Sequence, residues 1–362
     1  MQTVEMSLGS RSYRIVVEAG LLERAGPLVA AAIGACAALV VTDRTVGRLY
    51  LERFARSLSG AGFRVSAAEV PPGESSKCSE QLNRLYEACF QAGLERGSII
   101  VALGGGVVGD LAGFAAASYL RGLRFVQAPT TLLAQVDSSV GGKTGINLPG
   151  GKNLVGAFHQ PSLVVADVGA LETLDAREFA TGMAEVVKHA MIRDAALFER
   201  LESGGEELTH RRAEALEEIV AWNCRIKAEV VSADELESGL RAILNYGHTI
   251  GHAIEAASAY GSYTHGEAVA LGMKAEAEVA RARGYISEEV HGRQQALLER
   301  FGLPGRLRER LEAGALAAAM RHDKKVRAGR LRFVLPVGVG AVRVVDDVSE
   351  AEIGEALERL QP

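Results

Sequence analysis

Apolar residues in the first half of the chain fall into short β-branched runs, and longer stretches with helical periodicity separate these runs. Residues 1–20 alternate between polar and apolar side chains, which predicts an N-terminal pair of strands. Further strands are predicted at residues 35–43, 63–71, 98–104, 124–132 and 162–167, with helices between most of them. Alternation of this kind favours an α/β domain with a parallel sheet.

The pattern changes near Leu174, where strand-like runs almost vanish and helical periodicity takes over. Helices are predicted at residues 177–192, 195–203, 211–234, 247–258, 265–284 and 287–302. We therefore expect an α/β domain at residues 1–173 and an all-helical domain at residues 174–362, with the boundary near residues 172–176. The basic tract 321–336 is interpreted as a solvated loop that leads into a short hairpin strand, because no aromatic residues alternate with its cations as nucleic-acid binding would favour.

Composition and charge exclude several classes of protein. The chain has 362 residues, of which 48% are hydrophobic and 23% charged, as in an ordinary globular protein. Its net charge of −5 gives no general attraction to nucleic acid or anionic membrane. The longest apolar run, residues 28–41, is too short to span a bilayer, and the N-terminus lacks the apolar region of a signal peptide. Four cysteines without C-x-x-C spacing are expected to be reduced thiols of a cytoplasmic protein.

A glycine-rich turn follows the strand predicted at residues 98–104. Gly104, Gly106 and Gly109 satisfy G-x-G-x-x-G between a strand and a helix, where backbone N–H groups can approach a pyrophosphate. The acidic residue usually found about 20 positions later is absent, so Asp43, after an earlier strand, is the better candidate for a ribose contact. The turn favours a Rossmann-like nucleotide-binding domain, although a tight turn without a ligand is the alternative.

A second glycine-rich segment, residues 134–161, contains Lys143, Lys152 and Asn153. GGKT resembles part of a P-loop, but Asp137 stands where the first glycine is required, which rejects an ATPase. A loop with two lysines and an asparagine suits an anionic substrate. A flexible surface loop with solvated lysines is the alternative.

Side chains that can bind a metal or take part in catalysis are most concentrated at residues 241–255, RAILNYGHTIGHAIE. His248 and His252 are four residues apart and share a helix face, as metal-binding histidines do. The H-E-x-x-H signature is not satisfied, because Thr249 follows His248, so two surface or core histidines are an equal alternative. His265 lies downstream, and Glu185, Lys188 and His189 lie upstream, which leaves more than one ligand set open.

Taken together, the motifs resemble the 3-dehydroquinate synthase family of sugar-phosphate cyclases. They occur in order over most of the chain: PGESSK at 72–77, GGGVVGDLAGFAA at 104–116, the segment 121–147 with GGKTGIN, GKNLVGAFHQP at 151–161, GMAEVVKH at 182–189, LNYGHTIGHAIE at 244–255, HGEAV at 265–269, and DKK with RFVLP at 323–336. The resemblance implies a lyase that converts 3-deoxy-D-arabino-heptulosonate 7-phosphate to 3-dehydroquinate and phosphate in the shikimate pathway. It also implies NAD, which is reduced and reoxidised within each turnover, and a divalent zinc or cobalt ion.

The resemblance also assigns residues to roles. It implies metal binding by Glu185, His248 and His265, and therefore moves His252 to the substrate. The implied NAD contacts are Asp43, Glu74, Lys77, Gly105, Gly106, Val107, Val108, Gly109, Asp110, Thr130, Thr131, Lys143, Lys152, Leu171 and Thr173. The implied substrate contacts are Asp137, Lys143, Lys152, Asn153, Lys188, Lys227, Arg241, Asn245, His252 and either Lys324 or Lys325. Arg121 matches a residue that reaches into the partner's site, which implies a homodimer.

Three other functions remain as alternatives. A sister cyclase that acts on another sugar phosphate tends to change the positions of Arg241, Leu244 and Asn245, which are all retained here in RAILN. A metal-dependent polyol dehydrogenase would lack the lysine cluster and would release NADH. A catalytically inactive regulator would have lost a metal ligand or a lysine, and none of these is missing.

Overall fold

The chain forms two compact units in a computed structural model that describes residues 1–362 except 238, 259–261, 313, 315, 317–318 and 321–330. The first unit contains Met1–Leu174 and Ala213–Ser232, and the second contains Asp175–Arg212 and Ala233–Pro362. The division differs from the expected one at residues 213–232, which pack with the α/β unit although they follow the first helices of the second unit.

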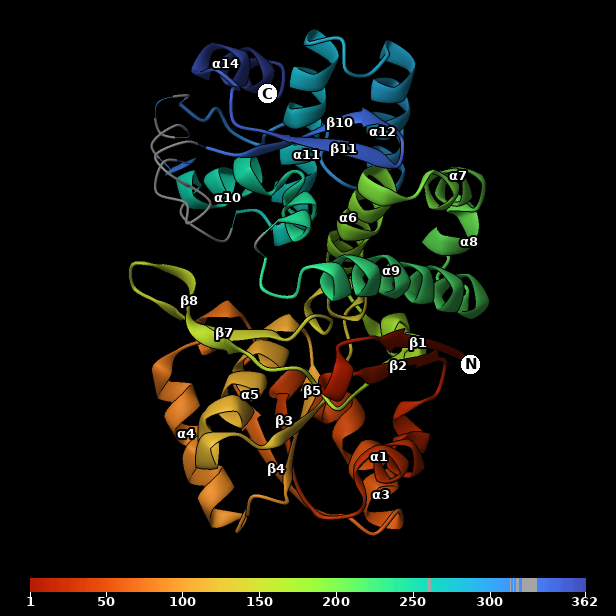
Figure 1. The fold of residues 1–362 in the computed structure, drawn as a ribbon, viewed down its shortest axis with the longest axis vertical. Coiled ribbons are helices and arrows are strands. Elements are labelled where there is room, and N and C mark those ends of the chain that lie inside the picture. The colour runs from red at the N-terminus through yellow and green to blue at the C-terminus, as the bar shows by residue number, and fades with distance from the viewer. Residues whose placement is uncertain (238, 259–261, 313, 315, 317–318, 321–330) are drawn as a thin grey trace. The chain divides into compact units, whose positions relative to one another are not determined.

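The first unit is built on one seven-stranded sheet in the order β1-β2-β9-β6-β5-β3-β4. All neighbouring strands are parallel except β1 and β2, which form the predicted N-terminal antiparallel pair. The strands are β1 Gln2–Met6, β2 Tyr13–Glu18, β3 Ala37–Asp43, β4 Arg64–Val70, β5 Ile99–Gly104, β6 Arg124–Pro129 and β9 Leu163–Asp167. The α-helices of this unit are α1 Ala25–Ile33, α2 Arg44–Val46, α3 Glu52–Gly60, α4 Ser79–Gln91, α5 Gly106–Ser118 and α9 Ala213–Ala233 (Figure 1).

Helices cover both faces of this sheet, because side chains along its central strands are apolar on both sides. In β3, Ala38 and Val40 belong to one core cluster, with residues of α1 and α3. Leu39 and Val41 belong to the other, with residues of α4 and α5. The predicted Rossmann-like architecture is confirmed.

The order of the strands places a topological switch point between β3 and β5. The chain leaves β3 for β4 on one side and returns to β5 on the other. Open α/β sheets bind ligands beyond the carboxyl ends of the strands at such a point. Asp43 ends β3 and Gly104 ends β5, so the two residues singled out from the sequence lie at this position.

The glycine- and lysine-rich segment is not the irregular loop that the sequence suggested. It forms an antiparallel hairpin of β7 Lys143–Leu148 and β8 Gly151–Phe158. Gly145 and Gly156 permit the pairing, since a Cβ at Gly156 would lie 2.0 Å from the Thr144 carbonyl oxygen. Glycines that disfavour an isolated strand are therefore required here for close approach of two backbones.

Helix α9 is held to the first unit by polar contacts along its length. The Glu217 carboxylate accepts from the Ala19 N–H at 2.9 Å, and Cys224 Sγ lies 3.3 Å from the Gln135 carbonyl oxygen. Lys227 Nζ donates to Asp137 Oδ1 at 2.6 Å. These partners explain why residues 213–232 group with the α/β unit.

The second unit is mainly helical. Its α-helices are α6 Ala176–Arg193, α7 Ala195–Ser203, α8 Gly205–Thr209, α10 His248–Ala257, α11 His265–Ala282, α12 Glu288–Arg300 and α14 Glu350–Glu358. The hairpin strand predicted at the end of the basic tract is present, because β10 Phe333–Gly338 pairs with β11 Ala341–Val345 in an antiparallel hairpin within this otherwise helical unit. Phe333 and Leu335 of β10 are buried in the same core cluster as α10, α11 and α14, so the hairpin completes this core.

No helix among the residues that the structure describes is both long and apolar enough to cross a membrane.

Candidate active site

The turn after β5 has the geometry of a phosphate-binding turn. Gly105 is the N-cap of α5, and the first N–H groups of a helix have no partner within the helix. Side chains would not fit in this turn. A Cβ on Gly104 would lie 2.7 Å from Val108, and one on Gly109 would lie 2.9 Å from the Gln127 amide. Both glycines are therefore needed to bring the helix onto the sheet, and the start of such a helix is where phosphate groups commonly bind.

Polar groups around this turn fit a nucleotide. Asp43 caps α2 by accepting the N–H groups of Thr45 and Val46 at Oδ1, and its Oδ2 accepts no hydrogen bond from the described residues. Thr130 Oγ1 is buried without a hydrogen-bond partner in the described part of the chain. A hydroxyl left in this way needs a partner, because an unsatisfied buried polar group is costly. Thr131 lies beside Gly105, and its Oγ1 accepts the Ala134 N–H at 3.2 Å.

Lys77 and Asp110 form a buried ion pair next to the turn, and both are predicted NAD contacts. Burial raises the pKa of Asp110 above its ordinary value, and the Lys77 ammonium only partly opposes that shift. Two more predicted NAD contacts differ in exposure. Leu171 is fully buried, whereas Thr173 is exposed and shares a 2.5 Å hydrogen bond with the Tyr50 hydroxyl.

Asn147 joins the Glu74–Lys77 segment to the β7–β8 hairpin. Its backbone N–H donates to the Lys77 carbonyl oxygen at 2.8 Å, and its Nδ2 donates to Glu74 Oε1 at 2.7 Å. Its Oδ1 accepts the backbone N–H of Asn153 at 2.8 Å. Asn153 has a φ of 56°, a left-handed conformation that this hydrogen bond helps to hold. Predicted NAD and substrate residues are thus connected through one side chain.

The remaining predicted substrate residues of the first unit lie on the hairpin and on α9. Lys143 at the start of β7 is exposed, and Lys152 in β8 is half-buried. Asp137 and Lys227 are brought together by the contact described above. Arg121 is exposed, with a φ of 69°.

In the second unit, Glu185, His248 and His265 converge although they are far apart in sequence. Glu185 Oε1 lies 3.5 Å from His248 Nε2 and 3.6 Å from His265 Nε2. One ligand atom from each residue lies within 4.8 Å of the others. A carboxylate and two imidazoles are a donor set that suits a catalytic zinc-type ion with an open position.

The surrounding elements orient these three side chains. Glu185 is fully buried on α6. Nδ1 of His248 lies 3.1 Å from the Tyr246 carbonyl oxygen, and donation to that oxygen leaves Nε2 as the electron-pair donor towards Glu185. Helices α10 and α11 approach closely, since a Cβ at Gly272 would lie only 1.9 Å from the Gly247 carbonyl oxygen.

His265 lies between two carboxylates. Its Nδ1 is 3.5 Å from Glu255 Oε2, while its Nε2 faces Glu185. Burial on its own lowers the pKa of His265, but hydrogen bonds and charges from Glu185 and Glu255 outweigh burial and raise that pKa to about 9. The two carboxylates therefore provide a place for one positive charge, carried either by a proton on the ring or by a bound metal cation.

His252 is also part of this cluster. Its ring centroid lies 5.5 Å from that of His248 and 6.0 Å from that of His265. His252, Glu255 and His265 form a second set of three possible ligands. The spacing of His248 and His252 alone therefore did not identify the ligand set, because neither set contains both residues: one combines His248 with Glu185 and His265, and the other combines His252 with Glu255 and His265.

Three further predicted substrate residues lie in the second unit. Lys188 is buried and pairs with Glu185, one turn away on α6. The Arg241 backbone N–H donates to Asp234 Oδ2 at 2.9 Å, and Asn245 Nδ2 donates to Glu237 Oε1 at 3.1 Å. Lys324 and Lys325 lie outside the described residues.

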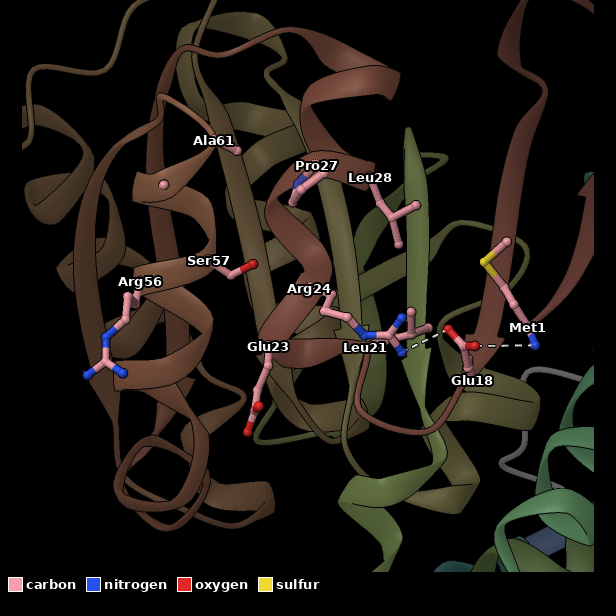
Figure 2. A pocket seen from close by; sticks show the side chains of 11 residues that line it. Met1, Glu18, Leu21, Glu23, Arg24, Pro27, Leu28, Arg56, Ser57 and Ala61 are labelled. Carbon is pink, nitrogen blue, oxygen red and sulfur yellow. Dashed lines mark hydrogen bonds and ion pairs between the residues drawn. The ribbon is translucent and has the colours of Figure 1, made fainter.

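A surface cavity of about 460 Å³ lies elsewhere in the first unit, beside α1 and α3 (Figure 2). Its lining includes the apolar side chains of Leu21 and Leu28 and the salt bridge between Arg24 and Glu18. Its lining, as far as the structure describes it, contains none of the predicted site residues.

Reasoning from the sequence did not single out Asn147 or Glu255. Asn147 lies within GGKTGIN, but nothing in that motif indicates contacts with a segment about 70 residues earlier. Glu255 falls in the fifteen-residue stretch noted above, and its place three residues after His252 was the available signal.

Comparison with solved structures defines the class of protein. A 2-epi-5-epi-valiolone synthase from Streptomyces hygroscopicus, solved with NAD⁺ and Zn²⁺, is 34% identical with a TM-score of 0.90 over 98% of both chains. A 2-deoxy-scyllo-inosose synthase complexed with carbaglucose-6-phosphate, NAD⁺ and Co²⁺ is 28% identical, with a TM-score of 0.88 over 98% of this chain and 99% of that one. The chain thus has the architecture of the sugar-phosphate cyclases.

Sequence comparison identifies the family within this class. Models of the N-terminal and C-terminal parts of 3-dehydroquinate synthase match residues 67–181 and 182–326. The 3-dehydroquinate synthase of Symbiobacterium thermophilum is 51% identical over 98% of this chain and 100% of its own length. That of Desulforamulus reducens is 48% identical over 98% of both chains. The chain belongs to the 3-dehydroquinate synthase family.

Proposed function

We propose that this enzyme converts 3-deoxy-D-arabino-heptulosonate 7-phosphate to 3-dehydroquinate and phosphate. The observation that carries this conclusion is the identity of 48–51% over almost the whole chain to enzymes named 3-dehydroquinate synthase. Similarity to the synthases of other cyclic products is lower, at 34% and 28%. Arg241, Leu244 and Asn245, which sister cyclases tend to change, are retained. A polyol dehydrogenase is disfavoured by the same comparison.

The residues present fit both implied cofactors. The turn Gly105–Asp110, with Asp43, Glu74, Lys77, Thr130, Thr131, Leu171 and Thr173, would hold NAD in the first unit. This assignment is supported by the first N–H groups of α5, which have no partner within the helix, and by the buried Thr130 hydroxyl, which has no hydrogen-bond partner among the described residues. Glu185, His248 and His265 would hold a divalent zinc or cobalt ion, supported by their convergent donor atoms. When bound, NAD supplies a reversible hydride acceptor and the metal supplies a Lewis acid for substrate hydroxyls.

The chain's own residues would bind and orient the substrate. Lys143, Lys152 and Asn153 on the hairpin offer cationic and amide donors, which suit phosphate and carboxylate oxygens. Lys227 orients the Asp137 carboxylate through the 2.6 Å contact. Lys188, Arg241, Asn245 and His252 would contact substrate from the second unit. The overall reaction releases one phosphate and is redox-neutral, so no net NADH is expected.

We further propose that residues 1–173 bind NAD and that residues 174–362 supply the metal and part of the substrate site, with Lys227 of α9 acting with the first unit. A homodimer is proposed because exposed Arg121 matches a residue that completes the partner's site. Cytoplasmic location is proposed from the four cysteines, which are all free thiols.

The test of the substrate is a comparison of phosphate release from three sugar phosphates. 3-Deoxy-D-arabino-heptulosonate 7-phosphate should exceed sedoheptulose 7-phosphate and glucose 6-phosphate by at least about 100-fold in kcat/KM, because cations that bind its carboxylate would be left unpaired by the other two. A preference for either of the others would replace this function with that of a sister cyclase.

A further inference from the structure

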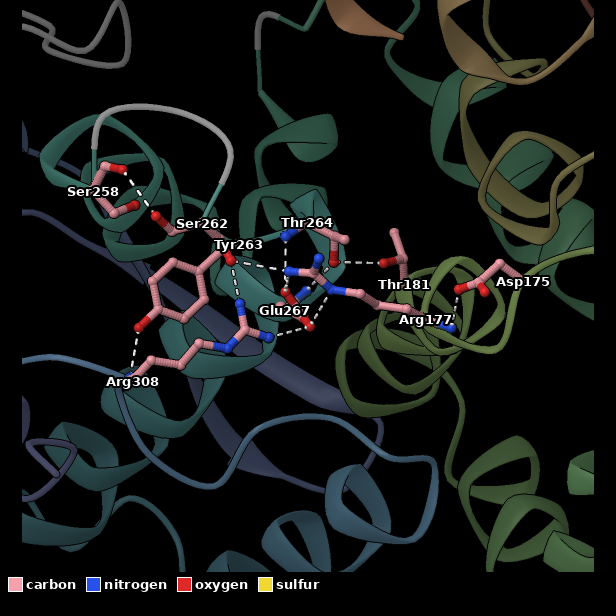
Figure 3. A network of polar contacts seen from close by, with 9 residues as sticks. All are labelled: Asp175, Arg177, Thr181, Ser258, Ser262, Tyr263, Thr264, Glu267 and Arg308. Carbon is pink, nitrogen blue, oxygen red and sulfur yellow. Dashed lines mark hydrogen bonds and ion pairs between the residues drawn. The ribbon is translucent and has the colours of Figure 1, made fainter. Parts of the chain in front are cut away.

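Two arginines from separate elements converge on the carboxylate of Glu267. Arg177 at the start of α6 donates from Nε and from one terminal nitrogen to the two oxygens, at 2.8 and 2.7 Å (Figure 3). Arg308 donates to Glu267 Oε1 at 2.6 Å. The Glu267 side chain is only 7% exposed, whereas those of Arg177 and Arg308 are 47% and 45% exposed. The carboxylate is therefore the buried member of the network, and loss of its partners would leave an uncompensated charge.

Glu267 lies two residues after His265, in the first turn of α11. It forms a capping box with Thr264, whose backbone N–H donates to Glu267 Oε2 at 2.8 Å. The Glu267 N–H in turn donates to the Thr264 hydroxyl at 3.3 Å. This reciprocal pair fixes the backbone on both sides of His265.

One face of α6 contacts the same segment, residues 264–267, at the start of α11. Arg177, Thr181 and Glu185 are spaced by four residues, so their side chains share one face of the helix. Each contacts the start of α11: Arg177 binds Glu267, and Thr181 Oγ1 lies 2.6 Å from Thr264 Oγ1. Glu185 lies 3.6 Å from His265. The contacts at Arg177 and Thr181 therefore set the position of α11 relative to the carboxylate that faces His265.

Arg308 holds the residues that lead into His265. Its backbone N–H donates to the Tyr263 hydroxyl at 2.7 Å, and its guanidinium lies 4.9 Å from the centre of the Tyr263 ring. Its side chain also donates to the Ser262 carbonyl oxygen, to which Arg177 donates at 2.9 Å. The two arginines thus bind both the approach to His265 and the turn after it.

We propose that Glu267, clamped by Arg177 and Arg308, is a positioning residue that holds His265 in register with Glu185 for metal binding. The proposal rests on the proposed function of Glu185, His248 and His265 as metal ligands. Groups that orient metal ligands without touching the metal commonly change metal affinity by about 10- to 100-fold when removed.

Helix α11 offers a matched control in Glu278. Its carboxylate is also bound by two arginines, by Arg281 at 2.7 Å and by Arg359 at 2.8 Å, and its side chain is 11% exposed. Glu278 lies 13 residues beyond His265, roughly 20 Å along the helix axis. Glu278→Gln removes a comparable network from the same helix without touching the turns beside His265.

The test is Co²⁺ binding to metal-free full-length protein, followed by the visible absorption of the bound ion and by competition with a chelator. Glu267→Gln should weaken Co²⁺ binding by about 10- to 100-fold and alter the absorption spectrum. Arg177→Gln and Arg308→Gln should each weaken Co²⁺ binding by a smaller factor. These two variants provide the test if Glu267→Gln fails to fold. Glu278→Gln should bind Co²⁺ like the unmodified protein, even if its thermal unfolding midpoint falls as much as that of Glu267→Gln.

Three results would overturn the proposal, and the third is distinguishable from the first two. Unchanged Co²⁺ affinity and spectrum in Glu267→Gln, or an equal loss in Glu278→Gln, would reduce the clamp to a general contribution to stability. His265→Ala is included because it tests the ligand itself. Full Co²⁺ affinity in that variant would remove the proposed metal site, and the positioning role with it.

Discussion

At the scale of single residues, Asn147 shows why one side-chain type is required. Its amide donates to Glu74 and accepts from the Asn153 backbone at the same time. Aspartate has the same shape but could only accept, and it would place two carboxylates side by side. Leucine would offer neither group. An asparagine is therefore the side chain that connects a proposed NAD contact with a proposed substrate contact.

Two substitutions separate these contacts. Asn147→Asp should weaken NAD binding about 2- to 10-fold, since it loses the donation to Glu74, while the KM for the sugar phosphate changes less because the acceptor for Asn153 remains. Asn147→Ala should weaken NAD binding and also raise the KM for the sugar phosphate. Calorimetric titration with NAD and steady-state kinetics measure the two effects. Asn83→Ala, on the exposed side of α4, is the control. Equal NAD affinity in all three variants would show that Asn147 has no such role.

At the scale of elements, the pair α10 and α11 carries His248 and His265 and depends on glycine. Gly247 precedes α10 with a φ of 76°, and a Cβ there would lie 2.5 Å from Met273. A Cβ on Gly272 would lie 1.9 Å from the Gly247 carbonyl oxygen. The distance between the two histidines is therefore set by the absence of side chains at the helix crossing.

Gly272→Ala should force the helices apart, lower stability by about 1–3 kcal/mol or more, and weaken metal binding. Gly292→Ala is the matched control, because its Cβ would meet nothing within 4 Å in α12. It should stabilise the protein by about 0.4–1 kcal/mol, as alanine favours a helix over glycine. Urea unfolding of the two variants measures the difference. A Gly272→Ala protein as stable as Gly292→Ala would mean that the helices tolerate the added methyl group.

Local patterns predicted elements well wherever the local preference agreed with the tertiary structure. The strand, turn and helix around Gly104 and Gly106 were predicted because a β-branched run, a glycine turn and an alanine-rich segment follow one another. The hairpin β7–β8 was missed because its glycines lower strand propensity, and their reason, close backbone pairing, is not local. The first strand of the hairpin β10–β11 was predicted from the apolar run that ends the basic tract, whereas its partner β11 was not.

The sequence indicated many of the residues of the candidate site, but not which of them contact one another. The histidines and lysines stand out by type, whereas the choice of Glu185 and His265 over His252 came from the family resemblance. Arg177 and Arg308 were not predictable, since nothing near either residue indicates contact with Glu267 some 90 or 41 positions away. Only the sequence THGE at 264–267 carried a local signal, as a capping box.

At the scale of the whole molecule, the proposed dimer would add a group from a second chain to the site. Arg121 is exposed and has a left-handed conformation, a form that costs energy for a residue other than glycine. Strain of this kind commonly accompanies function. If Arg121 completes the partner's site, the two sites of a dimer depend on each other in a way that can be measured.

Mixing two inactive variants tests this dependence. Arg121→Ala and His265→Ala should each be inactive as pure proteins. After unfolding and refolding together, mixed dimers contain one site with both His265 and the partner's Arg121, so activity should reappear. The control is Arg121→Ala mixed with a variant that carries both changes. Absence of recovered activity, with mixed dimers shown by mass spectrometry, would place Arg121 outside the partner's site.

One experiment tests whether the enzyme releases phosphate in a metal-dependent and redox-neutral reaction. Phosphate release from 3-deoxy-D-arabino-heptulosonate 7-phosphate is followed with catalytic NAD⁺, with and without a chelator, while absorbance is monitored at the NADH band. We expect one phosphate to be released for each substrate consumed, with no lasting NADH signal. The chelator should abolish this release, and Zn²⁺ or Co²⁺ should restore it. Phosphate release that survives complete metal removal, or NADH that accumulates in proportion to product, would contradict the account.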